Sequence, residues 1–156
     1  MKLLSVPNLR QTPSYCGPTS LKAVLAYYGL NKSEAELTRL SGATKSKGVE
    51  ASGIVRAAHK LGFHAEIRDG STLSQLSRLV LDKKIPVIVD WFSTDEGHYS
   101  VVVGLDQKKI HLMDPELGAI RTLPVKDFER VWFDFAPPVM QSAKDLILRR
   151  MIIIQK

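Results

Sequence analysis

The chain has only one cysteine and no long apolar run, and these two shortages exclude several classes of protein. A single cysteine rules out an internal disulfide framework and a zinc site built from several thiolates. No apolar stretch approaches the roughly 20 residues that a transmembrane helix needs. The start, MKLLSVPNLR, lacks the sustained apolar segment of a signal peptide. We therefore expect no membrane span in this chain and a cytoplasmic location.

Charge of one sign is not concentrated anywhere in the sequence. Lysine and arginine number 22 against 16 aspartate and glutamate residues, but the basic residues are scattered in pairs such as Lys83–Lys84 and Arg149–Arg150. This distribution is typical of a solvated surface, so we expect no nucleic-acid partner. The sequence also lacks internal repeats, low-complexity tracts and a GxxxxGK[ST] phosphate-binding loop.

What the sequence does contain is enough apolar material for one domain, because 44% of its 156 residues are hydrophobic. Apolar residues at helical spacing predict helices near residues 17–28, 33–40, 54–61 and 73–83. Later patterns predict strands near 63–67, 85–91, 98–105, 109–114, 120–123 and 132–135, the last closing the sheet, and a helical turn over 125–130. Helices first and antiparallel strands later predict an α+β domain with two segregated halves.

A proline pair after residue 136 suggests a boundary in the chain. We expect one domain over residues 1–136. Residues 137–156 are expected to form a C-terminal extension that packs on the domain or on a partner.

The lone cysteine lies where the first helix should begin. At that place Cys16 would benefit from the helix macrodipole, which stabilises a thiolate. Most lone cysteines are packing residues, so a catalytic interpretation needs partners elsewhere in the chain. Of the four histidines, His98 is the best candidate, because it opens a strand directly after the acidic loop 93–97. The other three, His59, His64 and His111, lie inside predicted elements.

The hairpin that follows His98 gives a geometric test. If its turn centres on Gln107, Ser100 faces Asp114, and His98 points to the same side of the sheet. His98 and Asp114 are then diagonal neighbours with Cβ atoms roughly 7–8 Å apart. A register shifted by one residue would move Asp114 to the opposite face, so this pairing is a specific prediction about register. Gln11, five residues before the cysteine, completes a set of four residues that fit four distinct roles.

Five stretches carry a resemblance to a known family: QTPSYCGPTSLKAVLAYYG, GVEASGIVRAAHKLGFHA, KKIPVIVDWF, GHYSVVVGLD and IHLMDPELG. In this order they resemble the papain-like cysteine peptidases that process bacteriocin precursors by cutting after a double-glycine leader. The interval from glutamine to cysteine is one residue shorter here than in that family. Tyr15 also stands where an acidic residue is common. In many relatives the peptidase domain precedes membrane helices and an ATPase, neither of which this sequence contains.

The resemblance implies a papain-like fold and a role for each candidate residue. Cys16 would be the nucleophile, His98 the general base and acid, and Asp114 the residue that orients the histidine. Gln11 would donate its side-chain amide to the oxyanion, together with the backbone N–H of Cys16. A peptide or protein substrate, and an exporter partner in trans, are the implied partners.

Three other functions remain open at this point. An acyltransferase or transpeptidase would use the same residues and the same thioester but a different acceptor. A non-catalytic peptide-binding module would keep the fold, although the retained cysteine argues against it. A metal site made of Cys16, His98 and Asp114 is a more distant alternative, because it would need a further ligand such as water. Our expectation is a peptidase with no metal and no cofactor.

Overall fold

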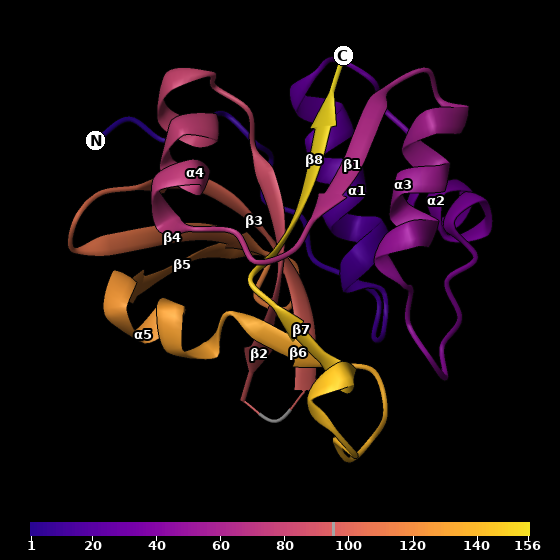
Figure 1. Cartoon of the computed structure of the whole chain (residues 1–156). Helices are drawn as coiled ribbons and strands as arrows, with labels where there is room; N and C mark the ends of the chain where they lie inside the picture. The colour runs from indigo at the N-terminus through magenta and orange to yellow at the C-terminus, as the bar shows by residue number, and fades with distance from the viewer. Residues whose placement is uncertain (95) are drawn as a thin grey trace.

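The computed structural model describes residues 1–94 and 96–156 and shows an antiparallel sheet with helices on both faces (Figure 1). The sheet has six strands in the order β1-β8-β2-β3-β4-β5. The predicted α+β class is therefore confirmed, and the predicted helices and strands are present with ends displaced by only a few residues.

Three helices from the first part of the chain cover one face of the sheet. They are α1 (Cys16–Tyr27), α2 (Glu34–Ser41) and α3 (Ala51–Lys60). Ser33 caps α2 by accepting a hydrogen bond from the backbone N–H of Glu36. Their apolar sides bury such residues as Leu21, Leu37 and Ile54.

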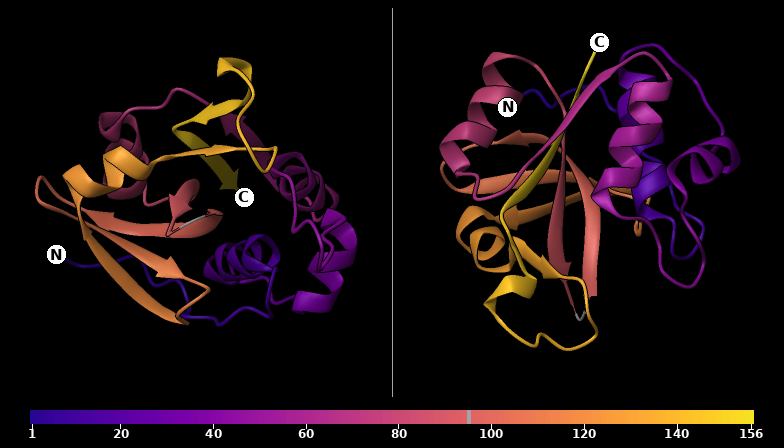
Figure 2. Two further views of the ribbon diagram at one scale, coloured as in Figure 1. Left: turned by 90° about the horizontal axis from the view of Figure 1, so that it is seen from below. Right: turned by 45° about the vertical axis from the view of Figure 1, so that its right-hand side comes forward.

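The opposite face is covered by shorter helical segments, as the right panel of Figure 2 shows. These segments are α4 (Leu73–Ser77), the π-helical turn η1 (Arg78–Asp82) and α5 (Val125–Val131). Thr72 and Gln75 form a reciprocal capping box at the start of α4. Phe128 of α5 and Trp132, which directly follows this helix, pack against the sheet.

The strands of the main sheet are β1 (His64–Arg68), β2 (Val87–Ser93), β3 (Glu96–Leu105), β4 (Lys109–Asp114), β5 (Ala119–Pro124) and β8 (Arg150–Gln155). Neighbouring residues on each strand face opposite helical layers. On β3, for example, Val101 belongs to the core under α1–α3, whereas Val102 belongs to the core under α4 and α5. The sheet is thus buried on both faces, which explains its continuous apolar runs.

The end of the chain contributes directly to this sheet. β8 lies between β1 and β2, and its residues Met151–Ile154 are buried. Of residues 137–156, which the sequence suggested as an extension, this part therefore packs inside the domain.

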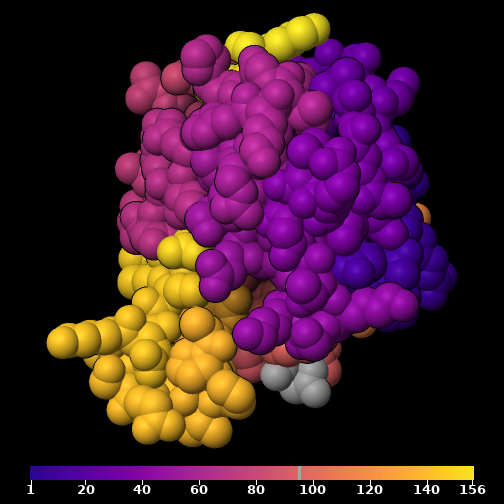
Figure 3. All heavy atoms as spheres, turned by 90° about the vertical axis from the view of Figure 1, so that its right-hand side faces the viewer, coloured from indigo at the N-terminus to yellow at the C-terminus, as the bar shows by residue number. Residues whose placement is uncertain are grey.

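A second, two-stranded sheet lies beside the main one. It pairs β6 (Phe133–Phe135) with β7 (Leu146–Leu148), and a short 3₁₀ turn, η2 (Ala143–Asp145), leads into β7. The prediction that residues 132–135 close the main sheet is therefore wrong, because β6 finds its partner in a later segment. In Figure 3 this part of the chain forms a lobe at the lower left.

The β3–β4 hairpin contains an irregularity that decides its register. Next to the turn, Gly104 pairs with His111, whereas beyond a bulge between Val102 and Gly104, Val102 pairs with Leu112. Without the bulge, Asp114 would lie opposite Val101, on the wrong face of the sheet for His98. The bulge restores the register that the sequence predicted, although its position was not anticipated.

Within the described residues, no helix combines the length and the apolar character needed to span a membrane.

Candidate active site

Cys16 is the first residue of α1 and is half-buried. The first turn of this helix approaches the sheet closely, since a Cβ on the next residue, Gly17, would collide with Val49 and touch Tyr99 of β3. Only glycine permits this approach. The close packing sets the cysteine over the end of β3, where His98 is found.

His98 and Asp114 are joined by a hydrogen bond. The distance from Nε2 of His98 to Oδ1 of Asp114 is 2.6 Å, and both side chains are buried. Because Asp114 occupies Nε2, the other ring nitrogen, Nδ1, is the one left for a different partner. The ring also packs edge-on against Trp91, whose Nε1–H donates to the hydroxyl of Ser100. The imidazole is therefore held in one orientation.

The electrostatics of His98 favour the imidazolium form. Burial by itself would lower the pKa of His98, but hydrogen bonds with Asp114 and Cys16, and the charges of these two groups, raise the pKa to about 10. Contact with Cys16 is thus part of what stabilises the protonated ring. Cys16 of α1 is therefore near enough to the imidazole of β3 to raise its pKa, and the catalytic pairing of the two stays a prediction.

Asp114 has further partners that sequence reasoning missed. Arg121 donates from Nε to Oδ2 of Asp114 at 2.6 Å, and the backbone N–H of Glu116 donates to Oδ1 at 3.0 Å. Burial would raise the pKa of Asp114, but the hydrogen bond and charge of His98, then Arg121 and Glu116, lower it. Arg121 comes from β5, opposite Leu112, and its guanidinium lies 5.9 Å from the centre of the Trp91 ring. The carboxylate is therefore kept ionised and fixed from both sides.

Gln11 lies next to the turn that follows Asp114. Its backbone N–H donates to the carbonyl of Pro115 at 2.9 Å. The side-chain Oε1 of Gln11 is buried and has no hydrogen-bond partner among the described residues. The structure thus connects Gln11 to the Asp114 turn, and the assignment of its amide to an oxyanion stays a prediction.

The loop between Gln11 and Cys16 is fixed by a residue that the sequence analysis did not single out. Glu34, at the start of α2, accepts hydrogen bonds from the backbone and hydroxyl of Thr12 and from the hydroxyl of Thr19. Burial would raise the pKa of Glu34, but these hydrogen bonds and Lys22 lower it. One ionised carboxylate therefore holds the loop before Cys16 to the helix that Cys16 begins.

The three remaining histidines are used elsewhere. His59 bonds to the carbonyl of Ala65, His111 bonds to the hydroxyl of Thr122, and His64 is exposed on β1. None of them replaces His98 in the site.

This arrangement of side chains is unfavourable for metal binding. Ligand atoms of His98, Asp114 and Glu116 lie within 4.8 Å of one another. However, the Asp114 carboxylate already accepts hydrogen bonds from His98 and Arg121. A cation would have to displace that guanidinium, so the donor set suits proton exchange better than metal coordination.

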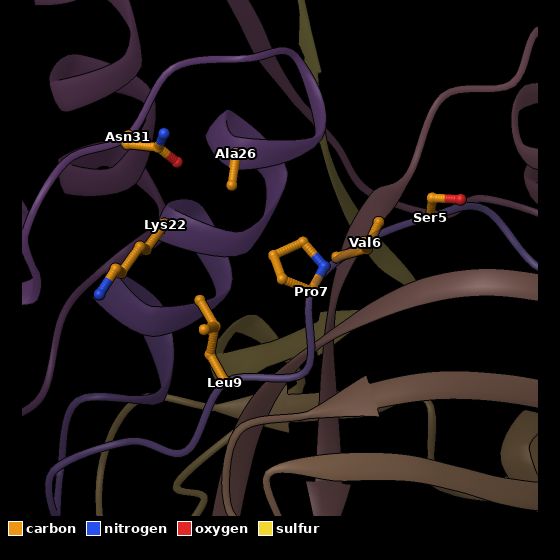
Figure 4. Close-up of a pocket in the computed structure, with 7 residues that line it drawn as sticks. All are labelled: Ser5, Val6, Pro7, Leu9, Lys22, Ala26 and Asn31. Atoms are coloured by element: carbon orange, nitrogen blue, oxygen red, sulfur yellow. The ribbon is translucent and has the colours of Figure 1, made fainter.

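One surface pocket of about 550 Å³ lies apart from these residues. It is formed by the N-terminal segment and the outer side of α1, with Pro7, Leu9 and Ala26 among its walls (Figure 4). None of Gln11, Cys16, His98 and Asp114 lines it, so it adds nothing to the site.

A helix that begins at a cysteine and packs against an antiparallel sheet, with a histidine at the sheet's end, defines a papain-like α+β fold. Comparison with known proteins gives the family. The chain belongs to the peptidase C39 family, whose model matches residues 7–142. The resemblance stated from the sequence is therefore confirmed.

Individual relatives agree with this assignment. An uncharacterized protein of Methanothermobacter thermautotrophicus is 34% identical over 128 residues, which cover 78% of this chain and 80% of that protein. The pediocin PA-1 transport/processing ATP-binding protein of Pediococcus acidilactici is 29% identical over 136 residues, covering 83% of this chain but 18% of that protein. The crystal structure of the peptidase domain of Streptococcus ComA, a bi-functional ABC transporter in a quorum-sensing pathway, is 27% identical, with a TM-score of 0.70. That match covers 99% of this chain and 97% of the domain.

Proposed function

We propose that this chain is a cysteine peptidase in which Cys16, His98 and Asp114 form the catalytic triad. The observation that carries the proposal is the 2.6 Å bond between buried His98 and Asp114, and it is supported by the effect of nearby Cys16, which raises the pKa of the same imidazole. Membership of a peptidase family supports the reaction type. The retained nucleophile argues against a module that only binds peptides.

Acylation would use the thiol and the imidazole together. The Cys16 thiolate attacks the carbonyl carbon, forming a C–S bond and a tetrahedral oxyanion. The backbone N–H of Cys16 and the amide of Gln11 donate hydrogen bonds to that oxyanion. His98 then passes its proton to the leaving nitrogen, the C–N bond breaks, and a thioester remains on Cys16.

Deacylation reverses the direction of proton transfer. His98, now neutral, takes a proton from water as the water oxygen attacks the thioester carbonyl. The C–S bond breaks, the acid product leaves, and the imidazolium again stabilises the thiolate. Asp114 keeps Nε2 protonated throughout, so that Nδ1 is the nitrogen that carries the moving proton.

The substrate class is the finer part of the proposal. The pediocin relative is named for transport and processing, and the streptococcal relative is the peptidase domain of an ABC transporter. We therefore propose a peptide substrate cut after small residues such as a double-glycine leader, with an exporter as partner in trans. Removal of a leader before export places the reaction on the cytoplasmic side.

A cleavage assay on defined peptides tests this proposal. The purified chain is incubated with a library of leader-like peptides that differ at the two residues before the cut, and products are identified by mass spectrometry. We expect cleavage after Gly-Gly, and none with Cys16→Ala. No cleavage of any peptide by a chain that is folded and has a reduced Cys16 would refute the peptidase proposal. Adding an amine acceptor distinguishes transpeptidation, which would yield the peptide amide as the main product.

A further inference from the structure

Two acidic side chains that the catalytic scheme does not use, Asp90 and Asp134, lie close to Cys16. Asp90, on β2, is only 2% exposed, and its Oδ1 is buried without a hydrogen-bond donor among the described residues. Asp90 is paired across the sheet with Tyr99 of β3 and Arg150 of β8, so its side chain faces the layer under α1. The catalytic scheme above makes no use of this buried carboxyl group.

The carboxyl of Asp134, on β6, reaches the same place. Asp134 lies near enough to Asp90 to raise its pKa, and a Cβ on Gly97 would collide with all three atoms of the Asp134 carboxyl group. Two carboxyl groups can share a hydrogen bond only if one of them carries a proton. Gly97 directly precedes His98 on β3, so the pair lies against the strand backbone one residue before the candidate catalytic histidine.

The surroundings of Asp90 keep its proton in place. Arg150 of β8 faces Asp90, but its guanidinium is held by two hydrogen bonds to Asp69. From β3, the Tyr99 hydroxyl donates to the carbonyl of Val49, and α1 contributes Cys16. Burial first, and then the hydrogen bond and charge of Asp134, raise the pKa of Asp90 to about 9. Near neutral pH the pair therefore carries one proton.

Aromatic stacking shows how β6 is held at this end of the sheet. Phe92, the partner of Gly97 in the β2–β3 hairpin, stacks on Phe133 and Phe135 at centroid distances of 5.2 and 5.3 Å. Asp134 lies between these two phenylalanines in the chain. β6 thus touches the hairpin through rings on either side of Asp134 and through its carboxyl group.

We propose that Asp90 is a positioning residue: its protonated carboxyl donates to Asp134 and so holds β6 against Gly97, next to His98. The effect on catalysis rests on the proposed function, because it acts through the position of His98 and the charge near Cys16. When the shared proton is lost, two carboxylates are left in contact and repel each other. This adds a negative charge beside a site that must hold a thiolate, so activity falls before His98 itself deprotonates.

The test compares wild type with Asp90→Asn, whose amide donates to Asp134 without titrating, and with Asp134→Asn, which removes the like charge. Asp82→Asn, an exposed aspartate of η1, is the matched control. The first readout is urea unfolding between pH 5 and 9.5, which needs no activity. A carboxyl group whose pKa is raised in the folded state lowers the stability of the fold as the pH rises above the pKa that the group has in the unfolded chain. Relative to wild type, the ratio of folded to unfolded protein in Asp90→Asn should therefore rise by up to about tenfold per pH unit.

The second readout is the pH profile of peptide cleavage and of Cys16 alkylation by iodoacetamide. In wild type cleavage should decline from about pH 9, where Asp90 ionises, and the alkylation rate should change at the same pH without declining, because the thiolate persists at high pH. In Asp90→Asn the decline should move about one pH unit higher, toward the pKa of about 10 of His98. In Asp134→Asn, which removes a charge that raises the pKa of Asp90, the decline should move lower. Asp82→Asn should follow wild type in both readouts.

The two proposals fail separately. If the alkaline decline stays in place in Asp90→Asn, the positioning role is wrong, even if the stability difference is found. If unfolding of Asp90→Asn has the same pH dependence as wild type, the shared proton itself is wrong. If wild type cleaves no peptide but alkylation shifts as described, the positioning of Asp90 stands and the peptidase proposal falls.

Discussion

Arg121 donates to the oxygen of Asp114 that His98 leaves free, at 2.6 Å, so the carboxylate is bound by a cation on each side. Asp114 is completely buried, and an ionised carboxyl at such a place is costly unless both of its oxygens have donors. The arginine therefore extends the chain of contacts from Cys16 and His98 to a fourth residue, on β5. Its side chain also covers Trp91, which packs against His98.

Replacing Arg121 by methionine should destabilise the fold and weaken the site. The pair combines a fully buried partner with one that is 28% exposed, so we expect a loss of about 1–3 kcal/mol at pH 7, between the values for exposed and buried pairs. Since the pKa of Asp114 is lowered in the folded state, the ion pair stabilises the fold at pH values above the pKa of the unfolded chain. This contribution is lost as the pH falls. Urea unfolding at pH 7 and pH 3 measures both effects. Arg130→Met, on the exposed side of α5, is the control, and equal losses in the two variants would contradict the prediction.

Removing the imidazole should slow the chemistry of the thiol. His98→Ala takes away the imidazolium that stabilises the Cys16 thiolate, so alkylation by iodoacetamide at pH 7 should slow by about tenfold or more. The rate is followed by mass spectrometry of the intact chain. His64→Ala, an exposed histidine of β1, should react like wild type. Equal rates for the two variants would mean that His98 does not act on Cys16.

Local patterns were sufficient for most elements of the fold but not for their long-range pairing. Helices such as α1 and α3 were predicted from apolar spacing and closing glycines, which are local signals. The position of β8 depends on partners far away in sequence, β1 and β2. The apolar residues 151–154 are apparent in the sequence, but such a run does not identify the strands that will pair with it. The same reason explains β6, whose partner β7 follows an irregular segment.

The candidate site shows a similar division. Cys16, His98 and Asp114 were identified because each has a distinctive place: a helix start, a strand end and an Asp-Pro turn. The bulge that sets the register lies in a uniform run, Val101–Val103, in which nothing marks the position of an extra residue. Arg121 belongs to a strand of alternating character, and its pairing with Asp114 follows only from the β4–β5 register and the burial of the carboxylate. The acidic loop includes Asp95, which lies outside the described residues.

Gln11 should matter for turnover more than for the reactivity of the thiol. If its amide donates to the oxyanion, Gln11→Ala should lower kcat/KM for a cleaved peptide by roughly 100- to 1,000-fold, the usual loss for one such donor. Alkylation of Cys16 passes through no oxyanion, so its rate should stay within about threefold of wild type. Gln107→Ala, in the exposed β3–β4 turn, is the matched control. A parallel fall of cleavage and alkylation would show that Gln11 supports the structure of the site rather than its transition state.

Glu34 should control the order of the loop that carries Gln11 and Cys16. Glu34→Gln keeps the size of the side chain but replaces a charged acceptor of three hydrogen bonds by a neutral amide. Charge-assisted hydrogen bonds are about twice as strong as neutral ones. We therefore expect roughly a 5- to 30-fold loss of kcat/KM, corresponding to about 1–2 kcal/mol, with the helices intact by circular dichroism. Glu36→Gln, on the same helix and with a partly exposed side chain paired with Lys32, is the control and should lose little. Because the pKa of Glu34 is lowered, the loss should be full at pH 7 and shrink only as the pH falls below the usual range for a glutamate, where wild type also becomes protonated. A Glu34→Gln enzyme as active as the Glu36→Gln control at pH 7 would show that the loop keeps its conformation without this carboxylate.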